Sequence, residues 1–500
     1  MNQQVPTKKY EFLADDPSVK VLPIILSLII GTFFAMMNET LLNIALTTLM
    51  GEFNITMTTV QWMTTGFMLV MGMIMPASAL LLQWFTTRQI FLGTMIIFTV
   101  GTIICASAPS FSVLLVGRFL QAVGTGLLSP VIFNIFLLLF PPARRGTMLG
   151  LIGLVFMFAP AIGPTLSGVI VEYLSWRYLF IFVVPFMIVS ILFAYKYLIN
   201  ISEVTKPKID VFSIMLSTIG FGGLVYGFSS AGAAVDGFRT PSVYLTILIG
   251  TISIAAFAIR QLKIKQPLLD LSVFRYPMFR LAVIMYIIII MSMLASEVIL
   301  PMYMQGPLMI SAASAGLLLL PGSLLNGLLS PVMGKLFDIF GPRKLIIPAT
   351  ILLSATMLIF SQFNTNTPQW LITVGYMMLM VSVSAIMMPT QTNALNGLPK
   401  SLYTHGTAVI TTLQPVAGAI GVSVFIGLLS SRQTKLLQES GGANPADAFI
   451  GGMKYVYLFG LAFAIISFLI SLFMRRAVPE PVTEQDAASN QPGIVVDNKL

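Results

Sequence analysis

The sequence predicts an all-helical integral membrane protein with fourteen transmembrane helices. Of its 500 residues, 57% are hydrophobic and only 9% are charged, whereas about a quarter of the residues of a soluble domain carry charge. The mean hydropathy is +0.92. Apolar runs of about 20 residues, the length that crosses about 30 Å of hydrocarbon, recur fourteen times.

The expected spans follow one another through short loops, so the chain has no room for a soluble domain. Several spans exceed the minimum length, which predicts tilted or kinked helices. The spans are 20–46, 58–83, 89–108, 111–140, 147–172, 177–198, 211–232, 241–262, 279–303, 311–334, 344–363, 368–392, 405–431 and 453–474.

The distribution of basic residues predicts the orientation. With the N-terminus in the cytoplasm, 21 of the 27 Lys and Arg residues fall on inner loops and tails, five fall outside, and Arg118 lies within a span. Cytoplasmic loops are enriched in Lys and Arg, so both termini are expected in the cytoplasm. The net charge of +9 then indicates topology and contact with anionic lipid, not nucleic-acid binding.

An internal repeat predicts two halves. Residues at the end of the second span match residues at the end of the tenth span at a constant offset of 255 positions, beginning with Gly72 and Gly327 and ending with Arg88 and Arg343. Paired halves are typical of transporters whose substrate site lies near the middle of the bilayer. The predicted parts are a cytoplasmic tail at 1–19, a six-helix bundle at 20–200, two inserted helices at 211–264, a second six-helix bundle at 279–476 and a disordered cytoplasmic tail at 477–500.

The fifth span carries Pro160, Gly163, Pro164 and Gly168 within one apolar run. Proline and glycine are tolerated in lipid because neighbouring helices satisfy the freed carbonyl groups, and small residues let another backbone approach. The pattern predicts a kinked helix that packs tightly beside a pore. The alternative is a helix that is bent for packing alone.

Three ionisable residues lie inside expected spans, and such residues are by default functional candidates. Glu39, Arg118 and Glu297 each lie about seven residues from the outer end of their span, or roughly 10 Å deep at 1.5 Å per residue. A carboxyl that binds a proton from one side and releases it to the other is sufficient for proton coupling. The alternative is that each side chain reaches the membrane surface or makes a polar contact at the end of its helix.

Polar residues in pore-like spans are the candidates for cargo binding. The 31 methionines and 36 phenylalanines suit soft walls for lipophilic molecules, and a few amides could orient a ligand. The alternative is hydrogen bonding between helices. The candidates are Asn38, Asn43, Asn326, Gln391 and Gln414.

Several motifs together resemble the fourteen-helix drug:proton antiporters of the major facilitator superfamily. The fifth span resembles the antiporter motif of that family, and GRFLQAVGTG, which contains Arg118, is similar to the motif whose arginine is linked to proton transfer. The run NETLLNIAL is similar to the first-helix motif of the lincomycin-resistance branch. The resemblance implies a major facilitator fold of two six-helix bundles plus two inserted helices, in a bacterial plasma membrane.

The chain departs from the family pattern at two places. Asn38 stands where many relatives have an aspartate, and the acid is Glu39 instead. The first cytoplasmic signature retains only Arg88 of its charged set, whereas the second, GKLFDIFGPRK, has both Asp338 and Arg343. We expect these charges, together with the Pro and Gly residues of the fifth span, to control conformation, because a charge pair present in one state biases the equilibrium. Ordinary positive-inside residues are the alternative.

The expected function is proton-coupled efflux of small lipophilic compounds by alternating access. An exporter of a lipid or an endogenous metabolite on the same scaffold is the alternative. One histidine and one cysteine do not make a metal-binding cluster, and no phosphate-binding GxxxxGK[ST] motif is present. We therefore expect no enzyme activity, no cofactor and no metal, and a monomer that contacts cargo, protons and lipid.

Overall fold

The computed structural model describes residues 20–140, 142–200, 210–231, 240–264, 267, 269–399, 402–439 and 444–477. Every regular element in this part of the chain is a helix. Residues 1–19 and 478–500, for which the sequence predicts tails, lie outside the described residues.

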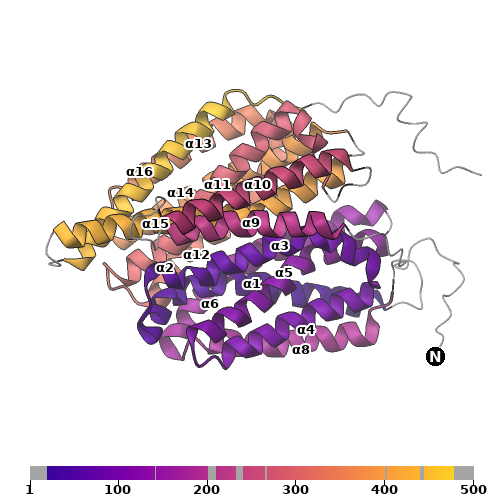
Figure 1. Cartoon of the computed structure of the whole chain (residues 1–500), viewed down its shortest axis with the longest axis horizontal. Helices are drawn as coiled ribbons and strands as arrows, with labels where there is room; N and C mark the ends of the chain where they lie inside the picture. The colour runs from indigo at the N-terminus through magenta and orange to yellow at the C-terminus, as the bar shows by residue number, and fades with distance from the viewer. Residues whose placement is uncertain are drawn as a thin grey trace, which may run out of the picture.

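Seventeen helical segments make up this part of the chain, in the order shown in Figure 1. They are α1 (Val21–Phe53), α2 (Met57–Val60), α3 (Trp62–Trp84), α4 (Thr87–Ala106), α5 (Phe111–Leu139), α6 (Pro142–Tyr173), α7 (Tyr178–Ile181), α8 (Val183–Tyr197), α9 (Val211–Ala231), α10 (Pro241–Lys263), the 3₁₀ helix η3 (Leu271–Arg275), α11 (Pro277–Gln305), α12 (Ala312–Phe340), α13 (Pro342–Phe360), α14 (Gln369–Asn396), α15 (Tyr403–Glu439) and α16 (Pro445–Ser471).

The long helices match the expected spans one for one. By length and composition, 12 helices of the described part can cross a membrane, α7 and α8 counting as one. The remaining two expected spans correspond to α3 and α6, which are 23 and 32 residues long. The prediction of an all-helical membrane fold is confirmed.

Some helices continue beyond the predicted spans. The longest, α15, has 37 residues and therefore a length of about 56 Å at 1.5 Å per residue, nearly twice the thickness of the hydrocarbon. Its last turns contain Arg432 and an exposed Lys435–Glu439 pair. Hydropathy identifies only the part of a helix that lies in the hydrocarbon. The backbone hydrogen bonds can continue the same helix into water, so the helix is longer than its apolar run.

The helices pack in two groups. The long helices from α1 to α8, here the N-terminal group, contact one another, and so do α11 to α16, the C-terminal group. In Figure 1 the N-terminal group forms the lower part of the molecule and the C-terminal group the upper part. Contacts of α6 with α12, of α3 with α15 and of α1 with α11 join the two groups.

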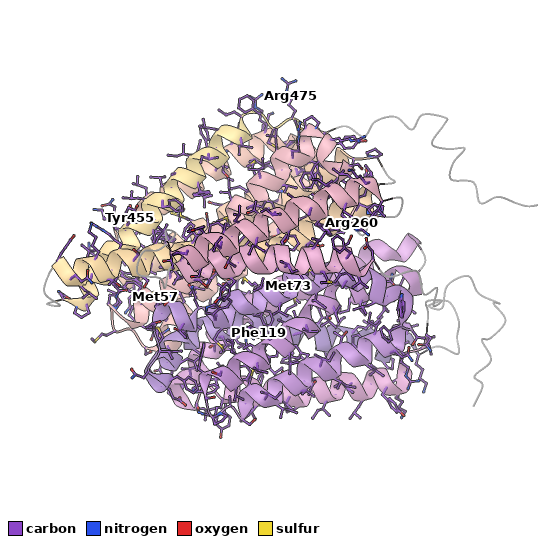
Figure 2. The ribbon with its side chains drawn as sticks, in the orientation of Figure 1. Met57, Met73, Phe119, Arg260, Tyr455 and Arg475 are labelled. Atoms are coloured by element: carbon purple, nitrogen blue, oxygen red, sulfur yellow. The ribbon has the colours of Figure 1, made fainter. Side chains whose placement is uncertain are left out.

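The pair formed by α9 and α10 lies beside one of these junctions. In addition to α10, α9 contacts both α3 and α15, and Phe221 and Val225 of α9 pack with Met68 of α3 and Val416 of α15. Figure 2 shows Met73 of α3 next to α9, and a Cβ atom at Gly222 would lie 2.3 Å from the Met73 methyl group. The inserted pair therefore covers the junction between α3 and α15.

Hydrogen bonds join the two groups at one end of the bundle. We call the end at which α1 terminates the outer end and the opposite end the inner end, following the predicted orientation. Gln305 at the end of α11 accepts a hydrogen bond from Thr47 of α1 at 2.5 Å and donates one to the Ile44 carbonyl at 2.9 Å. The Glu172 carboxylate of α6 accepts from the Ala313 amide of α12 at 2.7 Å. Among the described residues, the hydrogen bonds that join the two groups lie toward this outer end.

Candidate functional site

Arg118 is the centre of a buried polar network in the N-terminal group. Its side chain, on α5, is fully buried. The guanidinium donates to the Asn38 side-chain oxygen at 2.7 Å and to the Gln121 side-chain oxygen at 3.0 Å, and it lies 4.1 Å from the centre of the Phe67 ring. Because a buried charge without partners is costly, these neutral acceptors and the aromatic ring hold the cation within the bundle.

Asn38, a candidate for cargo binding from the sequence, is buried within the N-terminal group. Its side chain is only 1% exposed, and its oxygen is an acceptor for Arg118. The neighbouring candidate Asn43 is also buried and accepts a hydrogen bond from Thr64 at 3.5 Å. Both amides therefore bond to other helices, which is the alternative that the sequence left open.

Two residues of this network, Gln121 and Thr102, are not among the candidate site residues selected from the sequence. The Gln121 side chain donates to the Thr102 hydroxyl of α4 at 2.8 Å while its oxygen accepts from Arg118. Gln121 could have been found, because a residue three positions after Arg118 lies on the same helix face. Thr102 could not, since it comes from another helix and no local pattern marks it.

Glu39 and Glu297 lie on opposite sides of the junction between the two groups. Both side chains are partly buried. The Glu39 carboxyl lies close enough to Arg118 and to Glu297 for electrostatic interaction, and Glu297 also interacts with Tyr376 of α14. One oxygen of Glu297 is buried and has no hydrogen-bond partner among the described residues. The structure thus brings Glu39, Arg118 and Glu297 together.

The proline and glycine residues of α6 pack against two helices. Pro164 has no N–H group for the carbonyl of Pro160, and the Thr40 hydroxyl of α1 donates to that carbonyl at 3.1 Å. A Cβ atom at Gly163 would lie 2.1 Å from the Thr40 hydroxyl oxygen, and one at Gly168 would lie 2.3 Å from the Ala312 carbonyl oxygen of α12. The segment therefore contacts both α1 and the C-terminal group at backbone distance.

Comparison with known proteins agrees with this architecture. The family model described as Major Facilitator Superfamily matches residues 28–422 and 282–496. The chain belongs to the major facilitator superfamily. It is accordingly a multi-pass membrane transporter, as the resemblance in the sequence predicted.

Relatives within the superfamily include drug-resistance proteins. The chain is 49% identical to the lincomycin resistance protein LmrB of Bacillus subtilis over 463 residues, which cover 91% of this chain and 96% of that protein. LmrB of Listeria monocytogenes is 46% identical, with coverage of 92% and 98%. The multidrug export protein EmrB of Haemophilus influenzae is 25% identical, with coverage of 84% and 83%. The predicted resemblance to the lincomycin-resistance branch is confirmed.

Solved structures support the major facilitator fold alone. A peptide transporter of the POT family in complex with sulfate aligns with a TM-score of 0.65 and 14% identity, covering 93% of this chain and 98% of that one. A bacterial homologue of the lysosomal transporter Spinster aligns with a TM-score of 0.61 and 13% identity, covering 92% and 98%.

The charged residues of the two cytoplasmic signatures, Arg88, Asp338 and Arg343, lie at the inner end and do not bond to one another in the described part of the chain. The Arg88 guanidinium of α4 donates to the Tyr195 carbonyl of α8 and lies over the Tyr195 ring. The backbone carbonyl of Asp338 accepts a hydrogen bond from the Arg476 guanidinium at 2.9 Å. Asp338 and Arg343 are exposed, and no ion pair joins them in the described part of the chain. Arg88 therefore joins helices within one group.

The remaining cargo candidates lie in the C-terminal group. Asn326 of α12 accepts a hydrogen bond from Ser384 of α14 at 2.5 Å, and Gln391 is partly buried. Gln414 of α15 is exposed although it lies about 17 Å along its helix at 1.5 Å per residue, and it accepts from the Tyr286 hydroxyl of α11 at 3.0 Å. Of the five candidates, Gln414 is the most accessible.

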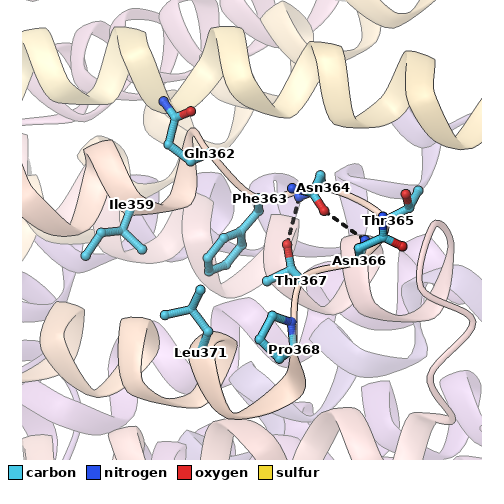
Figure 3. A pocket seen from close by; sticks show the side chains of 9 residues that line it. All are labelled: Ile359, Gln362, Phe363, Asn364, Thr365, Asn366, Thr367, Pro368 and Leu371. Atoms are coloured by element: carbon cyan, nitrogen blue, oxygen red, sulfur yellow. Dashed lines mark hydrogen bonds between the residues drawn. The ribbon is translucent and has the colours of Figure 1, made fainter.

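A hollow on the outer face is separate from these residues. It has a volume of about 550 Å³ and is lined by the loop between α13 and α14 and the adjoining helix ends. Figure 3 shows two hydrogen bonds within this loop. The Asn364 backbone N–H donates to the Thr367 hydroxyl, and the Asn366 backbone N–H donates to the Asn364 side-chain oxygen. These bonds stabilise the loop at the edge of the hollow. Its lining belongs to one group only, so it is not a route between the two groups.

Proposed function

We propose that this chain exports small lipophilic drugs in exchange for protons by alternating access. The observation that carries the proposal is the position of Glu39 and Glu297 at the junction of the two helix groups, with Arg118 beside Glu39. Alternating access needs a site between two bodies that move relative to each other. The similarity to lincomycin resistance proteins supports a drug as the cargo.

The proposal includes a plasma-membrane location with both termini in the cytoplasm. The excess of Lys and Arg on one side of the fourteen spans supports this orientation. We also propose that residues 20–200 and 279–476 act as the two moving bundles, with 211–264 as an inserted pair. We propose that the protein acts as a monomer that contacts cargo, protons and the surrounding lipid. The proposed cycle uses no cofactor or metal and leaves the cargo chemically unchanged.

The cargo is proposed to bind between the two groups, near the acidic residues. Gln414 and Tyr286 are one polar pair that a ligand could contact, because their hydrogen bond lies well inside both helices and Gln414 is exposed. Asn326 and Gln391 are further candidates in the C-terminal group. Asn38 and Asn43 are proposed to act through helix contacts, because both are buried and bonded to neighbouring helices.

A vesicle assay with lincomycin as the probe tests the function. Purified protein in vesicles is given an imposed pH gradient, and drug movement is followed before and after the gradient is collapsed. We expect uphill movement only while the gradient is present. Drug movement that is unaffected by collapse would contradict proton coupling, and movement of lipid but not drug would favour a lipid exporter.

A second measurement assigns the proton-carrying residue. Drug is added to the protein in weakly buffered detergent, and proton release and drug binding are both measured. Glu39→Gln and Glu297→Gln are compared with Glu439→Gln, which removes an exposed carboxylate at the end of α15. We expect binding without proton release in one or both of the first two variants and parental behaviour in the control. Full proton release from both variants would contradict the assignment.

A further inference from the structure

The inserted helices α9 and α10 pack against each other at backbone distance. Gly220, Gly223 and Gly227 of α9 face α10, and a Cβ atom at any of them would lie 3.0 Å or less from an atom of that helix. From the other side, a Cβ atom at Gly250 of α10 would lie 2.7 Å from the Leu224 amide nitrogen. Small residues let the two backbones approach closely, so we expect the two helices to move as one body.

The outer end of this pair is bound to the N-terminal group. Ser229, near the outer end of α9, accepts a hydrogen bond of 3.1 Å from the side chain of Gln61, the residue before α3. Both side chains are at most 1% exposed. The rings of the adjoining Trp62 and of Tyr226, one turn before Ser229, have their centres 5.7 Å apart. Because a buried amide that loses its partner is costly, this end of α9 should follow α3.

The inner end of the pair is bound to the C-terminal group. The buried side chain of Gln261 in α10 donates to the Ser213 hydroxyl of α9 at 2.8 Å and accepts from the Leu269 amide at 3.3 Å. The next amide, that of Asp270, donates to the ring of His405 near the start of α15 at 3.3 Å. The chain then forms η3, which contacts α10, α11 and α15. This end of the pair should therefore follow α15.

Between its two ends the pair lies over both groups. Phe221 and Val225 of α9 pack with Met68 of α3 and with Val416 of α15. Contacts between apolar side chains are not directional, whereas hydrogen bonds weaken steeply when their geometry is disturbed. The middle of α9 can thus shift over α3 and α15 more easily than either end can leave its hydrogen-bonded partner.

We propose that α9 and α10 form a brace across the junction of α3 and α15, with the outer end moving with the N-terminal group and the inner end moving with the C-terminal group. The inference rests on the proposed alternating access and adds how this junction stays covered during the cycle. When the two groups rock, a pair that is held in this way tilts instead of following one group. It then separates the α3–α15 junction from lipid in both states.

Distances between spin labels test the brace. One label on the pair is placed at its outer end, at Tyr244, or at its inner end, at Leu262, and both positions are exposed. Each is measured against a label on the N-terminal group and against one on the C-terminal group. The exposed partner positions are Val113 and Trp370 at the outer end, and Leu192 and Phe473 at the inner end. The native buried thiol is removed by Cys105→Ser.

A reference pair of labels identifies the state of the protein. Gly51, where an added side chain meets no atom within 4 Å, and Met309, which is 89% exposed, lie on the two groups at the outer end. The parent is compared with Gly168→Ala, because a Cβ atom at Gly168 would lie 2.3 Å from the Ala312 carbonyl oxygen and so favours separated outer ends. A longer reference distance in the variant marks the second state.

The expected result is a different partner for each end of the pair. The distance from Tyr244 should stay constant to Val113 and shift by several ångströms to Trp370. The distance from Leu262 should stay constant to Phe473 and shift by a similar amount to Leu192. If both labels on the pair kept their distances to the same group, the pair would be part of that group and the proposal would be overturned.

Ser229→Ala tests the outer attachment. The variant removes the acceptor for Gln61, so the distance between Tyr244 and Val113 should broaden and should then differ between the two states. Ser217→Ala is the matched control, because that buried hydroxyl donates to the Ile214 carbonyl of its own helix, and it should leave all distances as in the parent. Parental distances in Ser229→Ala would contradict the outer attachment. If Ser229→Ala does not fold, the four distances in the parent and in Gly168→Ala still decide the proposal.

Lincomycin efflux from vesicles is measured in parallel. Gradient-driven efflux by a protein in which both ends of the pair follow one group would refute the brace alone. The expected distances in a protein that moves neither drug nor protons would support the brace and refute the proposed function.

Discussion

The hydroxyl of Thr40 donates a hydrogen bond of 3.1 Å to the carbonyl of Pro160, the carbonyl that Pro164 leaves without a helical donor. Thr40 follows Glu39 directly in α1, so the same turn of α1 that carries the acid also holds α6 in place. Because α6 in turn contacts α12 through Gly168, a displacement of this turn would be transmitted to the C-terminal group.

Replacing Thr40 by valine should destabilise the protein. The substitution keeps the shape of the side chain but leaves the partly buried Pro160 carbonyl without a donor, which costs about 1–3 kcal/mol. Thermal unfolding in detergent measures the effect. Thr40→Ser keeps the hydroxyl and should retain most of the stability, so an equal loss in both variants would show that the methyl group matters rather than the hydrogen bond.

Replacing Gly168 by alanine should impair closure of the outer end. The new Cβ atom would lie 2.3 Å from the Ala312 carbonyl oxygen, so α6 and α12 must separate. Overpacking of this kind costs about 1–3 kcal/mol, and we expect drug efflux to fall about tenfold. Gly93→Ala in α4 is the matched control, because a Cβ atom there meets nothing within 4 Å. Normal efflux by Gly168→Ala would contradict the role of this contact.

Arg118 should not tolerate replacement by lysine. The planar guanidinium reaches Asn38 and Gln121 together, and a lysine ammonium cannot reproduce that fork. Loss of hydrogen bonds to a charged group costs about 3 kcal/mol, which corresponds to about a hundredfold loss of transport. Vesicle efflux measures the loss. Arg177→Lys, which changes a half-exposed ion pair with Glu52 at the outer end, should have a much smaller effect.

The ion pair between α9 and α10 should contribute stability that depends on pH. Burial alone would raise the pKa of Asp210, but hydrogen bonds from Arg260 and Ser213 and the positive charge of Arg260 together hold that pKa below its usual value of 3.8. The stabilising contribution is therefore complete above about pH 4 and is lost as the pH falls through the lowered pKa.

Asp210→Asn measures this contribution. The pair is partly exposed, so the variant should lose only about 0.5–1 kcal/mol at neutral pH. The difference in melting temperature between parent and variant should shrink as the pH falls below about 4 and approach zero below the lowered pKa of Asp210. A difference that is unchanged at low pH would show that the carboxylate charge is not responsible.

The sequence by itself determined the number of membrane-crossing helices and the rare residues that they contain. Each span is a local property of about 20 residues, so the fourteen long helices could be predicted without knowing their neighbours. Glu39, Arg118 and Glu297 could be selected for the same reason, since an ionisable residue in an apolar run stands out wherever the helix packs. The Pro and Gly residues of α6 were equally visible.

Only the tertiary structure decided which side chains meet. Lipid tails are as apolar as the helix surfaces, so hydropathy does not say which helices are neighbours. The hydrogen bond from Arg118 to Asn38, the electrostatic interaction of Glu39 with Glu297, and the packing of α9 over α3 and α15 each join helices that are far apart in the chain. Such contacts depend on the close packing of whole helices, which no local pattern in the sequence records.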